Sequence, residues 1–442
     1  MKHFHSTRRD FLRLGAALAG SAAAAATAQT ADYKALVCIY LFGGNDGHNL
    51  IVPMEAAAYA SYRAARGPLA LPDGTASLIP VSTPGGVPYG LNSGLTTIAP
   101  LWAQQRLAVV ANVGTLVRPV SRAEVLAGTA PVPPNLYSHA DQTLQQQAGL
   151  AGGSGTGWGG RVADGVQSRN GTARFPASIS LSGQALFNAG STVASASLIP
   201  DFDLAPSGLR GWPDSVTAAR RAAAQQVLAY DNGMALVQAA NKVRQDAFTL
   251  NTLLSASGST TVSTVFPGYD VAYQLRQVAQ IIKLRGSTGM SRQVFFVGMG
   301  GYDTHSGQNW MHWDLLRQLS ESMAAFHAAT VELGVASQVT TFTQSDFGRT
   351  LQPSGSGSDH GWGNHQLVMG GAVKGGNVYG RFPYPALGGV DDAGNRGALV
   401  PSTSLEQFGA TLARWFGVPE AGLVQAFPNL GSFGSSNLGF MG

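Results

Sequence analysis

Three apolar runs of the sequence are each followed within a few residues by an aspartate, and Asp303 and Asp46 each have a histidine two positions later. The runs are Tyr33–Phe42 before Asp46, Arg292–Met299 before Asp303 and His305, and Val339–Thr343 before Asp346. Parallel strands bring such ends together at one edge of an open α/β sheet, where ligands bind. Carboxylates and imidazoles are donors for zinc, with calcium or manganese as alternatives. The pattern therefore predicts a divalent metal site.

A second group of histidines follows the third run. The Ser/Gly-rich stretch 353–358 is predicted to be a flexible loop that leads to Asp359 and His360, with His365 five residues later. Asn45, Asp46 and Gly47 also fit an Asx turn, which is an equally good interpretation of that motif alone. The complete set of predicted metal ligands is Asp46, Asp303, His305, Asp346, His360 and His365.

Candidate catalytic residues lie near these motifs. Ser138 precedes His139 and Asp141, in a pattern typical of a helix start with Ser138 as its N-cap. A hydroxyl at a helix N-terminus could also act as a nucleophile on a phosphate or sulfate group, although capping is the preferred interpretation. His139 and Arg349 are candidates to stabilise oxygens of such a substrate.

The N-terminus has the features of a twin-arginine (Tat) export signal over residues 1–28. Arg8 and Arg9 precede a short alanine-rich run that is too weakly apolar for a membrane anchor. Removal of residues 1–28 takes away four basic residues and one acidic residue, so the net charge falls from +4 to +1. We therefore expect a periplasmic or secreted protein, with the Tat translocase as export partner. The small remaining charge argues against nucleic-acid binding.

The rest of the chain fits one α/β domain, residues 33–442, with a doubly wound, mostly parallel sheet and helices on both faces. The run 107–114 predicts another buried strand, and 177–181 a short one. Residues 50–88 are predicted to be irregular, and Cys38 is expected in the core rather than in catalysis. Apolar spacing predicts helices over 214–253, 269–285, 310–333 and 404–416.

The motifs GGNDGHN, YSHADQ, GGYDTH and SDFGRT…DHGWGNH, in this order after twin arginines, resemble a family of Tat-exported bacterial proteins of unknown function. That family is placed in the alkaline phosphatase/sulfatase superfamily. The resemblance implies metals beyond the strand ends and hydrolysis of phosphate or sulfate esters. It also implies metal roles for Asp46, for Asp303 with His305, for Asp346, and for His360 or His365.

Two departures from the superfamily pattern bear on function. Phe347 stands where the superfamily has His or Asn, and no Cys-x-Pro-x-Arg motif is present for a formylglycine nucleophile. We expect an exported metal-dependent hydrolase that acts on small or polymeric esters. The alternative is a non-catalytic exported binding or surface protein with the same fold.

Overall fold

The computed structural model describes residues 32–442, apart from 151–152, 174, 201–212, 231–232, 236, 239–240, 242–243 and 246–260. The predicted export signal, residues 1–28, lies outside the described residues, as does much of the second half of the predicted 214–253 helix. The part of that helix that the structure describes as continuous is α7 (Asp214–Ala229).

A nine-stranded sheet forms the centre of the described chain. Its strand order is β13 (Val378–Tyr379), β5 (Leu107–Gly114), β12 (Asn364–Gly370), β9 (Val339–Ser345), β1 (Lys34–Leu41), β8 (Arg292–Met299), β6 (Ser178–Ser180) and β7 (Ser195–Ser197), and β14 (Thr403–Ser404) pairs with β5. Neighbouring strands are parallel except around β12, which is antiparallel to both β5 and β9. Every residue of β5, β8 and β9 is buried, as expected of strands covered on both faces.

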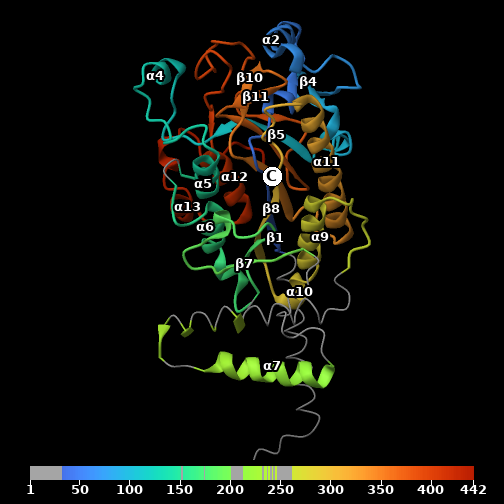
Figure 1. Ribbon diagram of the computed structural model, residues 1–442, viewed down its shortest axis with the longest axis vertical. Coiled ribbons are helices and arrows are strands. Elements are labelled where there is room, and N and C mark those ends of the chain that lie inside the picture. Colours follow the sequence, from blue (N-terminus) through green and yellow to red (C-terminus); the bar gives the residue numbers. More distant parts are fainter. Residues whose placement is uncertain are drawn as a thin grey trace, which may run out of the picture.

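Helices cover both faces of this sheet, so the predicted doubly wound architecture is confirmed (Figure 1). One face carries α9 (Asp270–Lys283) and α11 (Gln308–Glu332), and the other carries α5 (His139–Ala148), α6 (Trp158–Asp164), α12 (Leu405–Phe416) and α13 (Glu420–Ala426). Ser404 caps α12 in a box with Gln407, and Phe408, Leu412 and Phe416 of that helix are buried. None of the helices in the described part of the chain is both long and apolar enough to cross a membrane.

Smaller elements complete the structure, and two of them differ from the sequence prediction. The segment expected to be irregular forms α2 (Ala56–Arg66) and a three-stranded sheet of β2 (Ile51–Pro53), β4 (Pro88–Asn92) and β3 (Leu78–Ser82). The expected flexible loop is instead a hairpin of β10 (Arg349–Ser354) and β11 (Gly357–His360), in which Gly355 takes the positive φ of the tight turn. The remaining short helices are α3 (Pro100–Ala103), α4 (Arg122–Leu126) and α10 (Arg285–Thr288).

Candidate metal centre

The carboxyl ends of three neighbouring strands meet at one edge of the sheet. Leu41 at the end of β1 pairs with Met299 of β8 on one side and with Ser345 of β9 on the other. The loop after each strand therefore begins at the same level, which confirms the predicted convergence of these ends. Gly43 allows the loop after β1 to lie against the loop after β8. Its φ is +112°, and a Cβ there would lie 2.4 Å from the backbone nitrogen of Asp303.

Four side-chain atoms converge at this edge, and we call their residues (His139, Asp303, His305 and His360) the Asp303 cluster. The Oδ1 atom of Asp303 lies 2.9 Å from His305 Nε2, and 3.4 Å from the Nε2 atoms of both His139 and His360. The Nε2 atoms of His305 and His360 are 3.0 Å apart. His139, Asp303 and His360 each offer a ligand atom within 4.8 Å of the others, close enough to hold one metal ion.

Hydrogen bonds behind two of the imidazoles fix which ring nitrogen carries hydrogen. His139 Nδ1 lies 2.8 Å from Asp346 Oδ2, and His360 Nδ1 lies 2.7 Å from the carbonyl oxygen of Tyr137. Because the carboxylate and carbonyl oxygens accept these hydrogen bonds, both Nδ1 atoms donate, and the Nε2 atom of each ring faces Asp303. The Nε2 of His139 is buried and has no hydrogen-bond partner. A metal ion held with Asp303 and His360 would give this nitrogen a partner, so the donor set fits a metal ion.

Asp346 lies behind His139 rather than among the converging atoms. Its Oδ2 accepts from the backbone N–H of Gly43 at 3.1 Å as well as from His139, while its Oδ1 is buried without a partner. Burial raises the pKa of Asp346, partly offset by the hydrogen bonds from His139 and Gly43. In this arrangement Asp346 orients an imidazole, whereas the sequence pattern assigned it to the metal directly.

Arg349 is enclosed by the loops that carry the cluster. Its side chain is fully buried, and its guanidinium contacts Asp303 and donates to the carbonyls of Gly43 (2.7 Å), Gly44 (2.9 Å), Tyr302 (3.2 Å) and Ser358 (2.5 Å). Burial alone would raise the pKa of Asp303, but the hydrogen bond and charge of Arg349 outweigh it, and this pKa is lowered. The observed contacts are those of a loop-fixing residue, not of a group open to substrate.

Ser138 caps α5, as preferred from the sequence. Its hydroxyl donates to Asp141 Oδ2 at 2.5 Å and accepts from the Asp141 backbone nitrogen at 3.4 Å. The turn before it includes positive φ values at Asn135 (54°) and Tyr137 (72°). This turn presents the Tyr137 carbonyl to His360, a role that the sequence did not reveal. A nucleophilic role for Ser138 stays a prediction.

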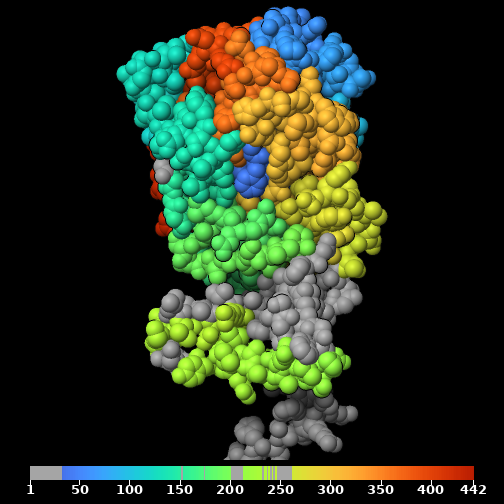
Figure 2. Space-filling model, in the orientation of Figure 1, coloured from blue at the N-terminus to red at the C-terminus, as the bar shows by residue number. Residues whose placement is uncertain are grey.

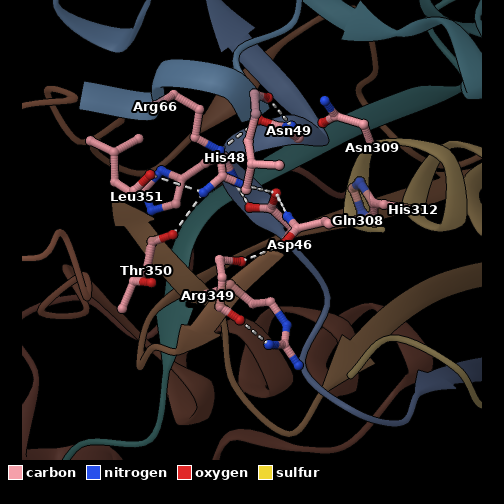
Figure 3. Close-up of polar contacts among 12 residues, drawn as sticks. Asp46, His48, Asn49, Arg66, Gln308, Asn309, His312, Arg349, Thr350 and Leu351 are labelled. Carbon is pink, nitrogen blue, oxygen red and sulfur yellow. Dashed lines mark hydrogen bonds and ion pairs between the residues drawn. The ribbon is translucent and has the colours of Figure 1, made fainter. Parts of the chain in front are cut away.

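Asp46 belongs to a separate buried network, drawn in Figure 3. Its Oδ2 contacts the guanidinium of Arg66 and accepts from Gln308 Nε2 at 2.5 Å, and its Oδ1 accepts from the His48 backbone nitrogen at 3.1 Å. Burial would raise the pKa of Asp46, but Arg66 outweighs this effect and the pKa is lowered. The structure thus pairs Asp46 with an internal cation, and the sequence missed Arg66 because it lies in a segment predicted to be irregular.

His365 also lies apart from the cluster. It is in β12, where its Nδ1 accepts from the backbone N–H of Asn112 at 3.0 Å and its ring stacks on Phe382 with centroids 4.7 Å apart. Burial lowers the pKa of His365 to about 3, so the ring is neutral at ordinary pH. Of the six predicted metal ligands, the structure brings together Asp303, His305 and His360.

Two further residues shape the surroundings of the cluster. Phe347 is buried and packs against the imidazoles of both His139 and His360, with ring centroids 4.7 Å and 4.6 Å from theirs. Asp359 lies 3.5 Å from His305 Nδ1 and pairs with Arg396 at 2.5 Å. The cluster therefore has an apolar wall on one side and a charged, partly exposed rim on the other.

The cluster is open to solvent. Nearly half of the Asp303 and His305 side chains is exposed, and about a third of His139. In Figure 2 a small blue area, from the chain near the end of β1, is visible at the centre of the molecular face between the teal segment of α5 and the gold segment of α11. The cluster is therefore open to solvent at Asp303 and His305, while the Nε2 of His139 lies buried behind them.

The chain belongs to the DUF1501 family of proteins of unknown function, whose model matches residues 33–416. No curated protein sequence matches it. Among 22 matching solved chains is the PsFucS1 sulfatase from Pseudoalteromonas sp. (10% identity, TM-score 0.33, covering 91% of this chain and 72% of the sulfatase). Another is the alkaline phosphatase PafA (11% identity, TM-score 0.28, covering 72% of this chain), of whose length this chain spans 63%.

Proposed function

We propose that this protein is an exported metal-dependent hydrolase of phosphate or sulfate esters, with its metal held by His139, Asp303 and His360. The observation that supports this proposal is the convergence of two imidazole Nε2 atoms on one Asp303 oxygen, while the Nδ1 atom of each ring donates a hydrogen bond on its far side. His305, whose Nε2 is 2.9 Å from the same oxygen, is a fourth candidate ligand. Zinc suits this nitrogen-rich set, since calcium prefers oxygen ligands; manganese is the other candidate.

Each residue has a distinct part in this proposal. Asp346 and the Tyr137 carbonyl hold the imidazoles in the tautomer that binds a metal, and Arg349 holds the Asp303 loop. A bound divalent ion would neutralise charge on the ester oxygens and lower the pKa of an oxygen nucleophile. Ser138, directly before His139, is the protein's own candidate nucleophile, with a water molecule as the alternative. Its present hydrogen bond to Asp141 would have to be exchanged for one to the substrate.

Export and location remain proposals that rest on the sequence of residues 1–28. The twin arginines Arg8 and Arg9 and the alanine-rich run suggest passage through the Tat translocase to the periplasm or beyond. Replacement of both arginines by lysine should leave unprocessed protein in the cytoplasm. Export that is unaffected by this change would contradict the assignment.

The decisive experiment is metal analysis of protein produced through its own export route and purified without chelators or a His-tag. We expect about one equivalent of zinc or manganese in the wild type and a loss of most of it in Asp303→Ala and His360→Ala. His327→Ala, which alters a half-buried histidine outside the cluster on α11, serves as the matched control. The metal-loaded protein is then screened on aryl phosphate and sulfate esters. A folded wild type without metal would contradict the proposal.

One observation favours a second candidate, an exported binding protein with a structural metal. Two of the predicted catalytic groups are engaged elsewhere, Ser138 with Asp141 and Arg349 with backbone carbonyls. Metal in the wild type, without turnover of any ester in the screen, is the outcome that would support this candidate.

A further inference from the structure

A groove of about 360 Å³ lies beyond the carboxyl end of β5, and no residue of the Asp303 cluster lines it. We call it the β5 groove. Leu116, just after β5, lines it together with Pro401 and Ser402, just before β14. Because β5 and β9 are each antiparallel to β12, they point the same way, and the groove is at the same edge of the sheet as the cluster. Ligands commonly bind at this edge, in pockets of about 300–1,000 Å³.

One side of the β5 groove is apolar. Leu116, Val400 and Phe433 line it and belong to a small buried hydrophobic cluster. Val390 also lines the groove, but 77% of this side chain is exposed. A ligand with a hydrocarbon body would remove such apolar surface from water, which favours binding.

The charged side of the groove has two guanidinium groups and one carboxylate. Asp391 is buried, and its Oδ1 lies 2.5 Å from Arg381 Nη2, so these two residues neutralise each other. Arg122 has no carboxylate partner among the contacts of the described residues. Its Nη2 donates to the carbonyl of Gly394 at 2.7 Å and to the amide oxygen of Asn395 at 2.9 Å.

Arg122 therefore leaves the lining of the groove with one uncompensated positive charge. Asp392, next to Asp391, does not line the groove, and its oxygens accept from the backbone N–H groups of Gly388 at 2.8 Å and Gly394 at 2.9 Å. Within the described part of the chain, Nη1 of Arg122 forms no hydrogen bond, so this donor is available to a ligand.

We propose that the β5 groove binds a small carboxylate with an apolar body. The carboxylate pairs with Arg122, because the planar guanidinium matches the two carboxylate oxygens, and it brings the charge of the lining to zero. The apolar body lies against the side formed by Leu116, Val400 and Phe433. This site is separate from the metal-dependent function proposed above and does not rest on it.

The first test compares naphthylacetate with its uncharged amide, which has the same apolar body. Binding of each to the wild-type protein is measured by calorimetry at neutral pH. Naphthylacetate should bind saturably with a Kd of about 1 mM or tighter, and the amide about tenfold more weakly. Equal affinity for the two, or no saturable binding of naphthylacetate, would overturn the proposal.

Variants of the lining test the assigned residues. Arg122→Gln should weaken naphthylacetate binding by about tenfold, because a charge-assisted hydrogen bond is lost, and should leave binding of the amide nearly unchanged. Arg118→Gln is the matched control, since Arg118 is partly exposed, pairs with Glu124 and does not line the groove. Its affinity should stay within about twofold of the wild type.

A second variant fills the groove without changing its charge. Ser402 lines the groove and is exposed, so Ser402→Trp adds bulk there and leaves the core intact. It should abolish binding of both probes, and this test stands even if Arg122→Gln does not fold. Undiminished binding to folded Ser402→Trp would overturn the proposal.

The metal centre is the other place where a carboxylate can bind, so the titration is repeated on folded, metal-free Asp303→Ala. Binding that persists in Asp303→Ala and is weakened in Arg122→Gln supports the β5 groove. Binding that is lost in Asp303→Ala and kept in Arg122→Gln would assign the carboxylate to the Asp303 cluster. That result would overturn the groove as a carboxylate site and leave the metal-dependent function standing, whereas a metal-free wild type would contradict that function alone.

Discussion

His139 donates from Nδ1 to Asp346 across 2.8 Å, although the two residues are 207 positions apart in the chain. The contact joins the start of α5 to the end of β9 and leaves the Nε2 of His139 directed at Asp303, 3.4 Å away. A carboxylate behind a ligating histidine fixes its tautomer and its ring orientation.

Asp346→Ala should weaken metal binding by about 10–100-fold, because His139 loses the acceptor that holds its ring. Asp346→Asn should lose much less, since its carbonyl oxygen can still accept from His139. Metal affinity is measured by competition with a chromophoric chelator, and circular dichroism confirms that both variants are folded. Equal losses in the two variants would show that the charge of Asp346, and not its hydrogen bond, is what matters.

The buried pair of Asp46 and Arg66 leads to a different prediction. Arg66→Met should reduce the free energy of unfolding by about 3–5 kcal/mol, because it leaves Asp46 buried without its cation. Metal content should stay at the wild-type level, since neither residue touches the Asp303 cluster in the described contacts. Urea unfolding and elemental analysis of the same preparation test both parts. If a folded Asp46→Asn variant loses its metal, Asp46 is a metal ligand, as the sequence pattern predicts, and the prediction for Arg66→Met is wrong.

The sequence predicts the long apolar strands β1, β5, β8 and β9 and part of the site, but not β12 or the small sheet of β2, β3 and β4. The runs that form β5 and β8 were predicted to the residue, because strands buried on both faces are continuously apolar. Asp303 and His360 were placed together because strand ends share an edge of the sheet. Two partners of the predicted ligands could not be predicted. Arg66, which pairs with Asp46, lies 20 positions after it, and Tyr137 holds His360 through its backbone carbonyl; neither gives a signal in composition or spacing.

Three buried histidines outside the cluster should make stability depend on pH. Burial lowers the pKa of His48 and of His312 to about 4, and that of His365 to about 3, whereas an unfolded histidine titrates near 6.5. The unfolded state therefore binds more protons between about pH 6.5 and 4, and stability should fall as pH falls through this range. Each ring contributes a slope of up to about 1.4 kcal/mol per pH unit.

This slope can be measured from urea unfolding at pH 7.5, 6, 5.5 and 5. In folded His365→Gln, the number of protons taken up on unfolding should fall by about one, which makes the slope less steep. His327→Ala, which alters a half-buried ring on α11, should reduce the slope less. A free energy of unfolding that is constant between pH 7 and 5 would contradict the neutral, buried state of these rings.

His139 and His305 compete for the place of the third metal ligand, and their environments predict which contributes more. His139 is held at 2.8 Å by a buried carboxylate and packs against Phe347, whereas His305 Nδ1 is 3.5 Å from Asp359 and nearly half of its side chain is exposed. A held ring loses less freedom when it binds a metal. His139→Ala should therefore weaken metal binding by more than about tenfold, and His305→Ala by less. Chelator competition at fixed pH measures both losses, and a Co(II)-substituted sample shows whether the ligand field changes with each variant. A larger loss in His305→Ala would reverse the assignment and make His305 the principal imidazole beside His360.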